Sequence, residues 1–326
     1  MTKPVLDVQG LKTYFFTDEG KIPAVDGVDF YVKEGEILGI VGESGCGKSV
    51  TSLSVMGLLP SPPGKIIGGH IYYKDDDITY ASEAKMRRIR GNEIAMIFQE
   101  PMTSLNPVFT IGSQLIEAIR IHKKCSKKAA SKRAVELLQL VGLPRAKELL
   151  EDYPHQLSGG MRQRVMIAMA MSCDPKVLIA DEPTTALDVT IQAQILELML
   201  KLNRETETAI IMITHDLGVV AQMCHRIVVM YAGKIVEEGL VRDIFNHPKH
   251  PYTQGLLRSV PDMGNRKERL YSINGSVPKP GTIKSGCLFA PRCEYVTERC
   301  IKEEPHLIKD QDNNNHGVRC WLYQEG

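Results

Sequence analysis

The feature that most constrains the fold of this chain is one run of eight residues, Gly42-Glu43-Ser44-Gly45-Cys46-Gly47-Lys48-Ser49. The run follows the apolar residues 37–41 and precedes a helix-forming segment, so it predicts a strand, a glycine-rich turn and a helix. Backbone N–H groups of such a turn converge on one point, and the helix adds its positive N-terminal end, which together make a cradle for polyphosphate. Lys48 can reach the β- and γ-phosphates, and the Ser49 hydroxyl can ligate Mg²⁺. The alternative interpretation is a strand-to-helix turn with an incidental lysine.

The bulk composition bounds the class of protein. The chain has 326 residues, enough for about two domains. Its 40 basic and 39 acidic side chains give a net charge of +1, which argues against a protein that binds nucleic acid or anionic lipid mainly through net charge. No apolar stretch reaches the length of a membrane span, and the N-terminus lacks the apolar core of a signal peptide. We therefore expect a soluble, cytoplasmic chain.

A second helix start also has the chemistry of an anion site. The residues Leu157-Ser158-Gly159-Gly160-Met161 precede a long run with helical character. A serine hydroxyl, exposed N–H groups and the helix dipole together favour a phosphate at such a position. An ordinary N-cap by Ser158 is the alternative interpretation.

Carboxylates and an imidazole follow two buried strands. Residues 177–182 form an apolar run that ends in Asp181 and Glu182. Asp181 suits the Mg²⁺ shell of a P-loop site and Glu182 can polarise the attacking water, with structural ion pairing as the alternative. His215 follows the next apolar strand, residues 209–214, at the end of the strand where parallel sheets bind ligands. A plain loop histidine is the other interpretation.

The remaining pattern predicts an α/β fold with an inserted helical segment. Strands are expected at residues 5–16, 24–32, 69–73, 94–98, 226–231 and 234–237, and helices near 85–89, 191–202 and 241–245. Helical spacing extends from residue 111 to 171, where a basic run at 123–133 is either a solvated face or a contact for lipid headgroups or RNA. The aromatic run Tyr14-Phe15-Phe16 either stacks on a base or packs on the core.

The cysteines are unevenly distributed. Four are scattered and are interpreted as buried or idle thiols, namely Cys46, Cys125, Cys173 and Cys224. The other four crowd into about the last forty residues, namely Cys287, Cys293, Cys300 and Cys320. In a cytosolic protein such a cluster indicates metal binding rather than disulfides.

The order of these parts resembles the nucleotide-binding subunit of ABC transporters over residues 1 to about 240. The parts are the P-loop, Gln99 at a strand exit, the Leu-Ser-Gly-Gly segment, the strand ending in Asp-Glu, Ala186-Leu187-Asp188 and His215. The resemblance implies a P-loop NTPase cassette. Its core would be a RecA-like mixed sheet with an antiparallel β portion, and a helical subdomain would be inserted at about residues 100–172.

The resemblance also implies a role for each motif residue. Gln99, Glu182 and His215 would be catalytic, as the contact to Mg²⁺ and water, the base and the γ-phosphate switch. Mg²⁺ would be held by Ser49, Gln99 and Asp181. ATP would be bound by Phe15, or its neighbour Tyr14, at the adenine and by Gly42, Ser44, Gly45, Cys46, Gly47, Lys48, Ser49 and Val50. Ser158, Gly159 and Gly160 of a second subunit would complete the site, with Asp188 at the dimer interface. Met161 replaces the family's usual glutamine.

The C-terminal part narrows the resemblance to the ATPase subunits of dipeptide and oligopeptide importers. Residues 99–107, 250–253 and 286–293 resemble segments of those subunits, and residues 262–286 are interpreted as a linker. The resemblance implies that residues 241–326 form an extension in which a [4Fe-4S] cluster is ligated by Cys287, Cys293, Cys300 and Cys320. Four thiolates also suit Zn²⁺, and free or bridged thiols are a third interpretation.

The resemblance implies an importer motor that hydrolyses ATP to drive peptide uptake. The chain would act on the cytoplasmic face of the membrane with two permease subunits, a second ATPase subunit, related or identical, and, indirectly, an extracytoplasmic peptide-binding protein, but without nucleic acid. The alternative is a soluble ABC ATPase that acts on DNA or ribosomes, although the sequence has no coiled-coil insertion, basic groove or second cassette. A cysteine tail that senses iron or oxidant is a third hypothesis. The cargo remains open among dipeptides, longer peptides and nickel.

Overall fold

The computed structural model describes residues 3–18, 20–99, 104–185, 188–259, 271–309 and 316–324. The described residues fall into two compact units, each built from discontinuous segments. The first unit comprises Met1–Val5, Val32–Glu36 and Tyr80–Met212, and the second comprises Leu6–Tyr31, Ile37–Thr79 and Ile213–Gly326. Three expected features lie partly outside the described residues: the loop after Gln99, the pair Ala186-Leu187 and the first part of the linker at 262–286.

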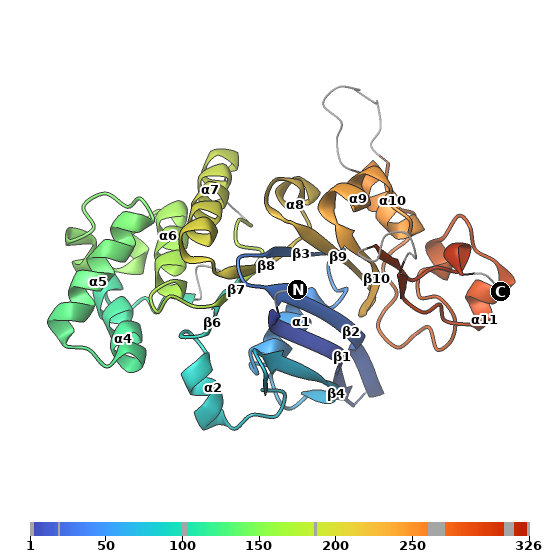
Figure 1. Cartoon of the computed structure of the whole chain (residues 1–326), viewed down its shortest axis with the longest axis horizontal. Coiled ribbons are helices and arrows are strands. Elements are labelled where there is room, and N and C mark those ends of the chain that lie inside the picture. Colours follow the sequence, from blue (N-terminus) through green and yellow to red (C-terminus); the bar gives the residue numbers. More distant parts are fainter. Residues whose placement is uncertain are drawn as a thin grey trace. The chain divides into compact units, whose positions relative to one another are not determined.

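An antiparallel sheet forms much of the N-terminal part of the second unit (Figure 1, blue). Its strands, in the order β2-β1-β4-β5, are β1 (Pro4–Thr17), β2 (Gly20–Lys33), β4 (Gly64–Tyr73) and β5 (Asp76–Asp77). Buried and more exposed residues alternate along much of β1, so one face of the strand packs inward. β1 and β4 pair from Leu6 and Tyr73 to Phe15 and Gly64, with an irregular register between Gln9 and Lys12.

A second sheet in the same unit delivers the glycine-rich turn. Its strands, in the order β11-β12-β10-β9-β3, are β11 (Ile308–Lys309), β12 (Gly317–Val318), β10 (Lys234–Leu240), β9 (Arg226–Tyr231) and β3 (Ile37–Val41). β3 and β9 are parallel, whereas β9 and β10 form an antiparallel hairpin around Ala232 and Gly233, both with positive φ. β3 is buried along its whole length, which explains its continuously apolar sequence. The helix α1 (Lys48–Val55) follows the turn.

An aromatic cluster joins the C-terminal segments to this sheet. α8 (Leu217–Met223), α9 (Val241–Asn246) and α10 (Pro251–Arg258) belong to the second unit, as does the short α11 (Glu298–Lys302). The ring centroid of Tyr231, at the end of β9, lies 4.7 Å from that of Tyr252 on α10 and 5.2 Å from that of Phe289. These three buried rings form one hydrophobic core with residues of β3 and α8.

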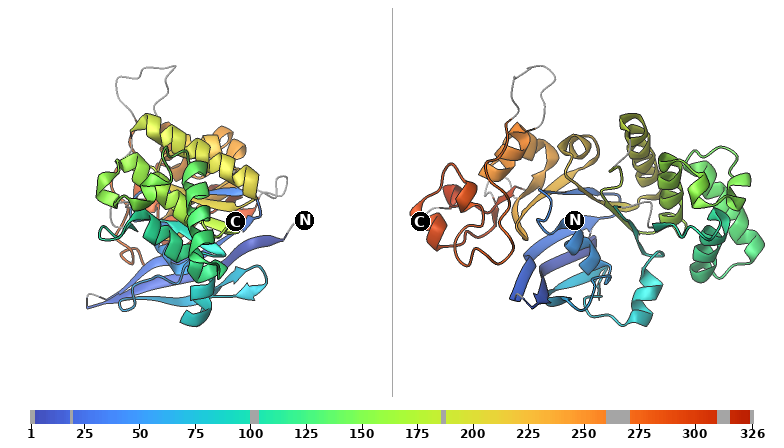
Figure 2. Two further views of the ribbon diagram at one scale, coloured as in Figure 1. Left: turned by 90° about the vertical axis from the view of Figure 1, so that its left-hand side faces the viewer. Right: turned by 180° about the vertical axis from the view of Figure 1, so that it is seen from behind.

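The first unit combines short parallel strands with helices. β6 (Ile94–Ile97) pairs in parallel with β7 (Val177–Asp181), and β8 (Ala209–Thr214) lies on the other side of β7. The helices are α2 (Glu83–Ile89), α4 (Ile111–Lys123), α5 (Lys127–Leu140), α6 (Gly159–Ala170) and α7 (Val189–Thr206). α4, α5 and α6 pack side by side (green in Figures 1 and 2). The expected mixed α/β class with an antiparallel portion is confirmed. None of the helices in the described ranges is both long and apolar enough to cross a bilayer.

Candidate functional site

The glycine-rich turn has the predicted strand, turn and helix around it, and its last glycine adopts a conformation that other residues disfavour. Gly47 is the N-cap of α1 with a φ of 104°, and a Cβ atom there would lie 2.5 Å from the carbonyl oxygen of Ala24. No side chain caps α1. The N–H groups of its first turn are therefore left for a ligand, and a helix start of this kind favours an anion.

Lys48 is held within the turn by backbone carbonyl groups. Its Nζ atom donates to the carbonyl oxygen of Gly42 at 2.7 Å and to that of Glu43 at 3.2 Å. The side chain is buried, so its charge is only partly solvated and is available to a bound polyphosphate. Ser49 lies beside it at the start of α1. The geometry of this turn is that of a phosphate-binding loop.

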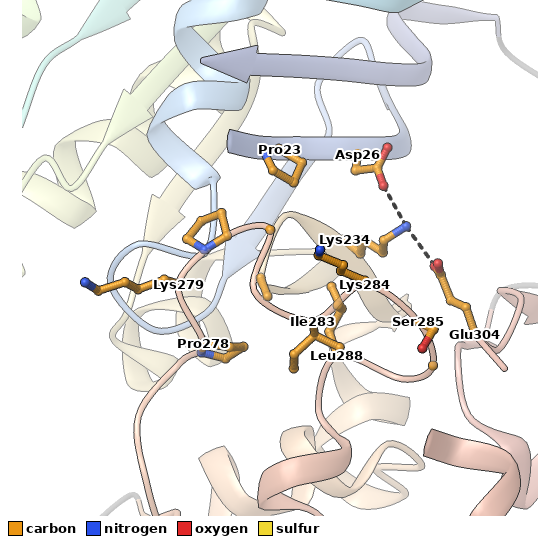
Figure 3. A pocket seen from close by; sticks show the side chains of 14 residues that line it. Pro23, Asp26, Lys234, Pro278, Lys279, Ile283, Lys284, Ser285, Leu288 and Glu304 are labelled. Carbon is orange, nitrogen blue, oxygen red and sulfur yellow. Dashed lines mark ion pairs between the residues drawn. The ribbon is translucent and has the colours of Figure 1, made fainter. Parts of the chain in front are cut away.

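A charged network engages Tyr14. Its hydroxyl donates to Asp26 at 2.8 Å, and the Nζ atom of Lys21 lies over the ring, 4.5 Å from its centroid. Burial, together with the hydrogen bond to Asp26, raises the pKa of Tyr14 to about 12. The Nζ atom of Lys234 lies 2.9 Å from a carboxylate oxygen of Asp26 and 2.8 Å from one of Glu304. All three residues line a cavity of about 120 Å³ (Figure 3). Both the hydroxyl and one ring face of Tyr14 are thus occupied.

In the first unit, Gln99 and Glu182 meet. The Nε2 atom of Gln99 donates to Oε2 of Glu182 at 2.9 Å, and the Thr185 hydroxyl donates to the same oxygen at 3.0 Å. Glu182 has a φ of 47°, a conformation that is uncommon outside glycine and that is found at functional turns. Asp181, at the end of β7, is buried. Two residues predicted to be catalytic are therefore in direct contact.

The helix starts at Ser158 and at Asp188 are also adjacent within the first unit. Ser158 is the N-cap of α6, and its hydroxyl accepts from the N–H of Met161 at 3.4 Å. Asp188 is the N-cap of α7 and accepts from the N–H of Ile191 at 2.9 Å. A Cβ atom on Gly160 would lie 2.9 Å from the Ile191 side chain, so α6 and α7 approach closely there.

His215 belongs to the second unit. It follows β8 and immediately precedes Asp216, whose carboxylate caps α8 by accepting from the N–H groups of Gly218 and Val219. The His215 side chain is exposed. Its position at the exit of a strand is the predicted one.

The C-terminal cysteines share one cavity. A cavity of about 150 Å³ is lined by Cys287, Cys293, Cys300 and Cys320 together with aromatic residues that include Phe289 and Trp321. Burial raises the pKa of Cys287 and of Cys320 to about 11. Among the residues that the structure describes, however, no three His, Cys, Asp or Glu side chains converge closely enough to hold a single metal ion. The thiols therefore surround a common space without forming a mononuclear site.

Tyr252 and Arg292 contact the P-loop, which the sequence did not predict. The Tyr252 hydroxyl accepts from the N–H of Glu43 at 2.8 Å, and Arg292 donates to both carboxylate oxygens of Glu43, at 2.7 and 3.1 Å. Tyr252 and Arg292 lie in segments that resemble the importer ATPases. The sequence therefore marked the segments, but it carried no signal for a contact across this separation in the chain.

A phosphate-binding loop after a buried strand, in a chain with an antiparallel sheet and a group of helices, defines a P-loop ATP-binding cassette. A family description of ABC transporters matches residues 25–185, and one of the C-terminal region of oligopeptide/dipeptide transporters matches residues 236–300. The chain also resembles the solved cassette MJ0796, in a dimeric post-hydrolysis state bound to ADP and Pi, with a TM-score of 0.65 and 30% identity. That match covers 73% of this chain and 99% of the cassette.

Curated relatives narrow the class to one family. The chain is 56% identical over 321 residues to the oligopeptide transport ATP-binding protein AppD of Bacillus subtilis, covering 98% of this chain and 97% of that protein. It is 54% identical over 304 residues to the dipeptide transport ATP-binding protein DppD of Haemophilus influenzae, covering 93% and 92%. The chain belongs to the family of ABC transporter ATP-binding subunits for oligopeptides and dipeptides, and it is an ATPase.

Proposed function

We propose that this ATPase hydrolyses MgATP between two cassettes, with the P-loop of one subunit and the Ser158-Gly159-Gly160 segment of another binding the same nucleotide. The observation that carries the proposal is the P-loop itself, in which Lys48 is held at an uncapped helix start. A second helix start with anion-binding character, at α6, gives one chain two half-sites. The dimeric state of the similar cassette that is bound to ADP and Pi supports this arrangement.

The proposal assigns one task to each motif residue. Glu182 is the base that polarises water, and its hydrogen bonds from Gln99 and Thr185 support an oriented carboxylate. Mg²⁺ is assigned to Ser49, Gln99 and Asp181, the γ-phosphate to His215 and the dimer interface to Asp188. Phe15 is assigned to the adenine in preference to Tyr14, because the Tyr14 hydroxyl and ring already contact Asp26 and Lys21. The nucleotide's phosphates are assigned to Gly42, Ser44, Gly45, Cys46, Gly47, Lys48, Ser49 and Val50.

In this proposal, ATP hydrolysis drives the import of peptides. AppD and DppD are named for oligopeptide and dipeptide transport, which supports a peptide cargo of one of these lengths. The proposed partners are two permease subunits, a second ATPase subunit, identical or related, and, indirectly, an extracytoplasmic peptide-binding protein. The chain then works at the cytoplasmic face of the membrane, because the permeases supply the membrane path. Action on DNA or ribosomes has no support among these relatives.

We also propose that Cys287, Cys293, Cys300 and Cys320 hold a [4Fe-4S] cluster with a structural role. Support comes from the cavity of about 150 Å³ that all four thiols line. Zn²⁺, at about 2.3 Å from each sulfur, would need the four sulfurs drawn together around one point, whereas a cluster occupies the space between more widely separated thiolates. When bound, the cluster would cross-link the segments that carry these cysteines.

The test of the ATPase mechanism is Glu182→Gln, which removes the basic carboxylate and keeps the size of the side chain. We expect turnover to fall by at least about 100-fold while MgATP binding is retained. Turnover is measured by phosphate release, and binding by titration with a fluorescent ATP analogue. Glu117→Gln is the matched control, because Glu117 is an exposed acid on α4, and it should leave both values unchanged. Normal turnover in the Glu182→Gln variant would exclude this residue as the base.

A further inference from the structure

Glu43, inside the P-loop, is fixed from outside the loop by the C-terminal region. Arg292 donates through its two terminal nitrogens to the two carboxylate oxygens of Glu43, and the Tyr252 hydroxyl accepts from the Glu43 N–H. A bidentate arginine–carboxylate pair restricts both direction and distance. Both the side chain and the backbone of Glu43 are therefore bound to residues more than two hundred positions later in the chain.

Arg292 is itself rigidly held. Its side chain is only 4% exposed, and its Nε atom donates to the carbonyl oxygen of Asn274 at 2.9 Å. The guanidinium also lies over the rings of Tyr231 and Phe289, at 5.8 and 6.0 Å from their centroids. An arginine that is buried and bonded in this way has few alternative positions. The pair therefore ties Glu43 to the C-terminal region.

The position of Glu43 in turn affects the phosphate-binding lysine. The carbonyl oxygen of Glu43 accepts from Nζ of Lys48 at 3.2 Å and from the N–H of Cys46 at 3.3 Å. A shift of Glu43 would thus displace a group that orients Lys48. The charge of Glu43 also matters: without Arg292, a loop with the geometry of a phosphate site would carry a carboxylate whose negative charge no arginine compensates.

We propose that Arg292 is a positioning residue for ATP binding, which acts through Glu43 and makes the nucleotide affinity of the P-loop depend on the C-terminal region. The proposal rests on the P-loop as the nucleotide site and does not depend on a metal cluster. Arg292 supplies no group to the reaction. Its loss should therefore raise the KM and Kd for MgATP and leave kcat at saturating ATP nearly unchanged.

The experiment is a double-mutant cycle in the full chain, with Arg292→Gln, Glu43→Gln and both together. We expect Arg292→Gln to weaken binding of a fluorescent ATP analogue by about tenfold, because Glu43 loses its two-pronged contact and its charge in the P-loop is left without the arginine. The double variant should bind no more weakly than Arg292→Gln alone, because Arg292 acts only through Glu43. Effects that simply add, or a lower kcat with unchanged Kd, would overturn the proposal.

Two further variants separate positioning from folding. Arg319→Gln is the matched control, because Arg319 is a largely buried C-terminal arginine that donates to the carbonyl groups of Ile235 and Pro305 and not to the P-loop. It should leave the Kd unchanged, and an equal loss of affinity there would contradict a specific role of Arg292. If Arg292→Gln does not fold, Arg292→Lys keeps the charge but loses the two-pronged contact. An intermediate loss of affinity is then expected, and wild-type affinity would refute the proposal.

Discussion

At the scale of single residues, His250 combines complete burial with a structural hydrogen bond. Its Nδ1 atom accepts from the N–H of Tyr252 at 3.1 Å, which caps α10. Burial lowers the pKa of His250 to about 4, and Arg319 acts in the same direction, whereas Glu237 opposes the shift. Glu237 also accepts from the His250 N–H at 2.9 Å and lies 2.8 Å from Nε2 of His316. Folding therefore favours the neutral imidazole of His250.

This burial predicts acid sensitivity in a defined pH window. The unfolded chain binds a proton at His250 near pH 6.5, but the folded chain does so only near pH 4. Stability from this group is thus complete above pH 6.5 and falls as the pH drops toward 4, by at most about 1.4 kcal/mol per pH unit. His250→Asn keeps a side-chain oxygen for the cap and should show a shallower decline.

Urea unfolding at a series of pH values measures this slope. Fluorescence of Trp321, the only tryptophan in the sequence, follows the C-terminal region directly. His306→Asn is the control, because His306 is exposed. Parallel stability curves for wild type and His250→Asn between pH 6.5 and 4 would show that the prediction is wrong.

The residues of the site differ in how far the sequence could predict them. Lys48 and Ser49 follow from local spacing, because a P-loop is one continuous run whose geometry depends on its own glycines. The partners of Glu43 could not be predicted, since Arg292 is separated from it by 249 positions and an ion pair leaves no local pattern. The contact between Gln99 and Glu182, 83 positions apart, likewise needed the fold.

At the scale of elements, β1 and β4 show where sequence pattern misplaces a strand boundary. The pattern predicted a strand at residues 69–73, but β4 begins at Gly64. The glycines in this segment resemble a loop in sequence, yet one of them accommodates the irregular register of β1. Gly69 has a φ of 84°, and a Cβ atom there would lie 2.4 Å from the carbonyl oxygen of Gly10. Helix starts were better predicted, since α6 begins at Gly159, directly after Ser158, and α9 begins at Val241.

We expect Gly69→Ala to lower the free energy of unfolding by about 2 kcal/mol or more, because the methyl group meets the backbone of β1 and the left-handed conformation is strained. The neighbouring Gly68→Ala is the matched control. A Cβ atom on Gly68 would contact only the Lys12 side chain, at an ordinary 3.7 Å. Urea unfolding measures both variants. Equal stability of the two variants would mean that the irregular pairing of β1 with β4 does not require glycine at position 69.

At the scale of the whole chain, each of the two compact units is built from segments that are far apart in the sequence. β1 and β2 both contribute residues to each of the two units, and the C-terminal segments share a unit with the P-loop. Sequence patterns predict only contiguous domains, because composition and motifs are compared along the chain. They carry no information on which distant segments pack together. The boundary at residue 240 and the helical subdomain at residues 100–172 therefore stay predictions.

The cavity lined by the four C-terminal cysteines predicts that the purified protein contains iron. Anaerobically purified chain should contain about four iron atoms per molecule and absorb broadly in the visible range. Cys287→Ser should lose most of this iron, because Cys287 lines the cavity and its N–H donates to the carbonyl oxygen of Cys300 at 2.7 Å. Cys125→Ser, outside the cavity, should keep it. Metal analysis that finds zinc without iron, or iron retained in Cys287→Ser, would contradict the assignment.

The pairing of β12 with β10 has a bearing on solubility. Glu237 and Glu238 of β10 pair with Val318 and Gly317 of β12, and β11 pairs with the other side of β12, so these two short strands together cover the border of the sheet at β10. A strand left without its neighbour is a template to which strands of other molecules add. Chains shortened before residue 317 would therefore tend to precipitate by intermolecular strand addition, even though every residue of the P-loop is still present.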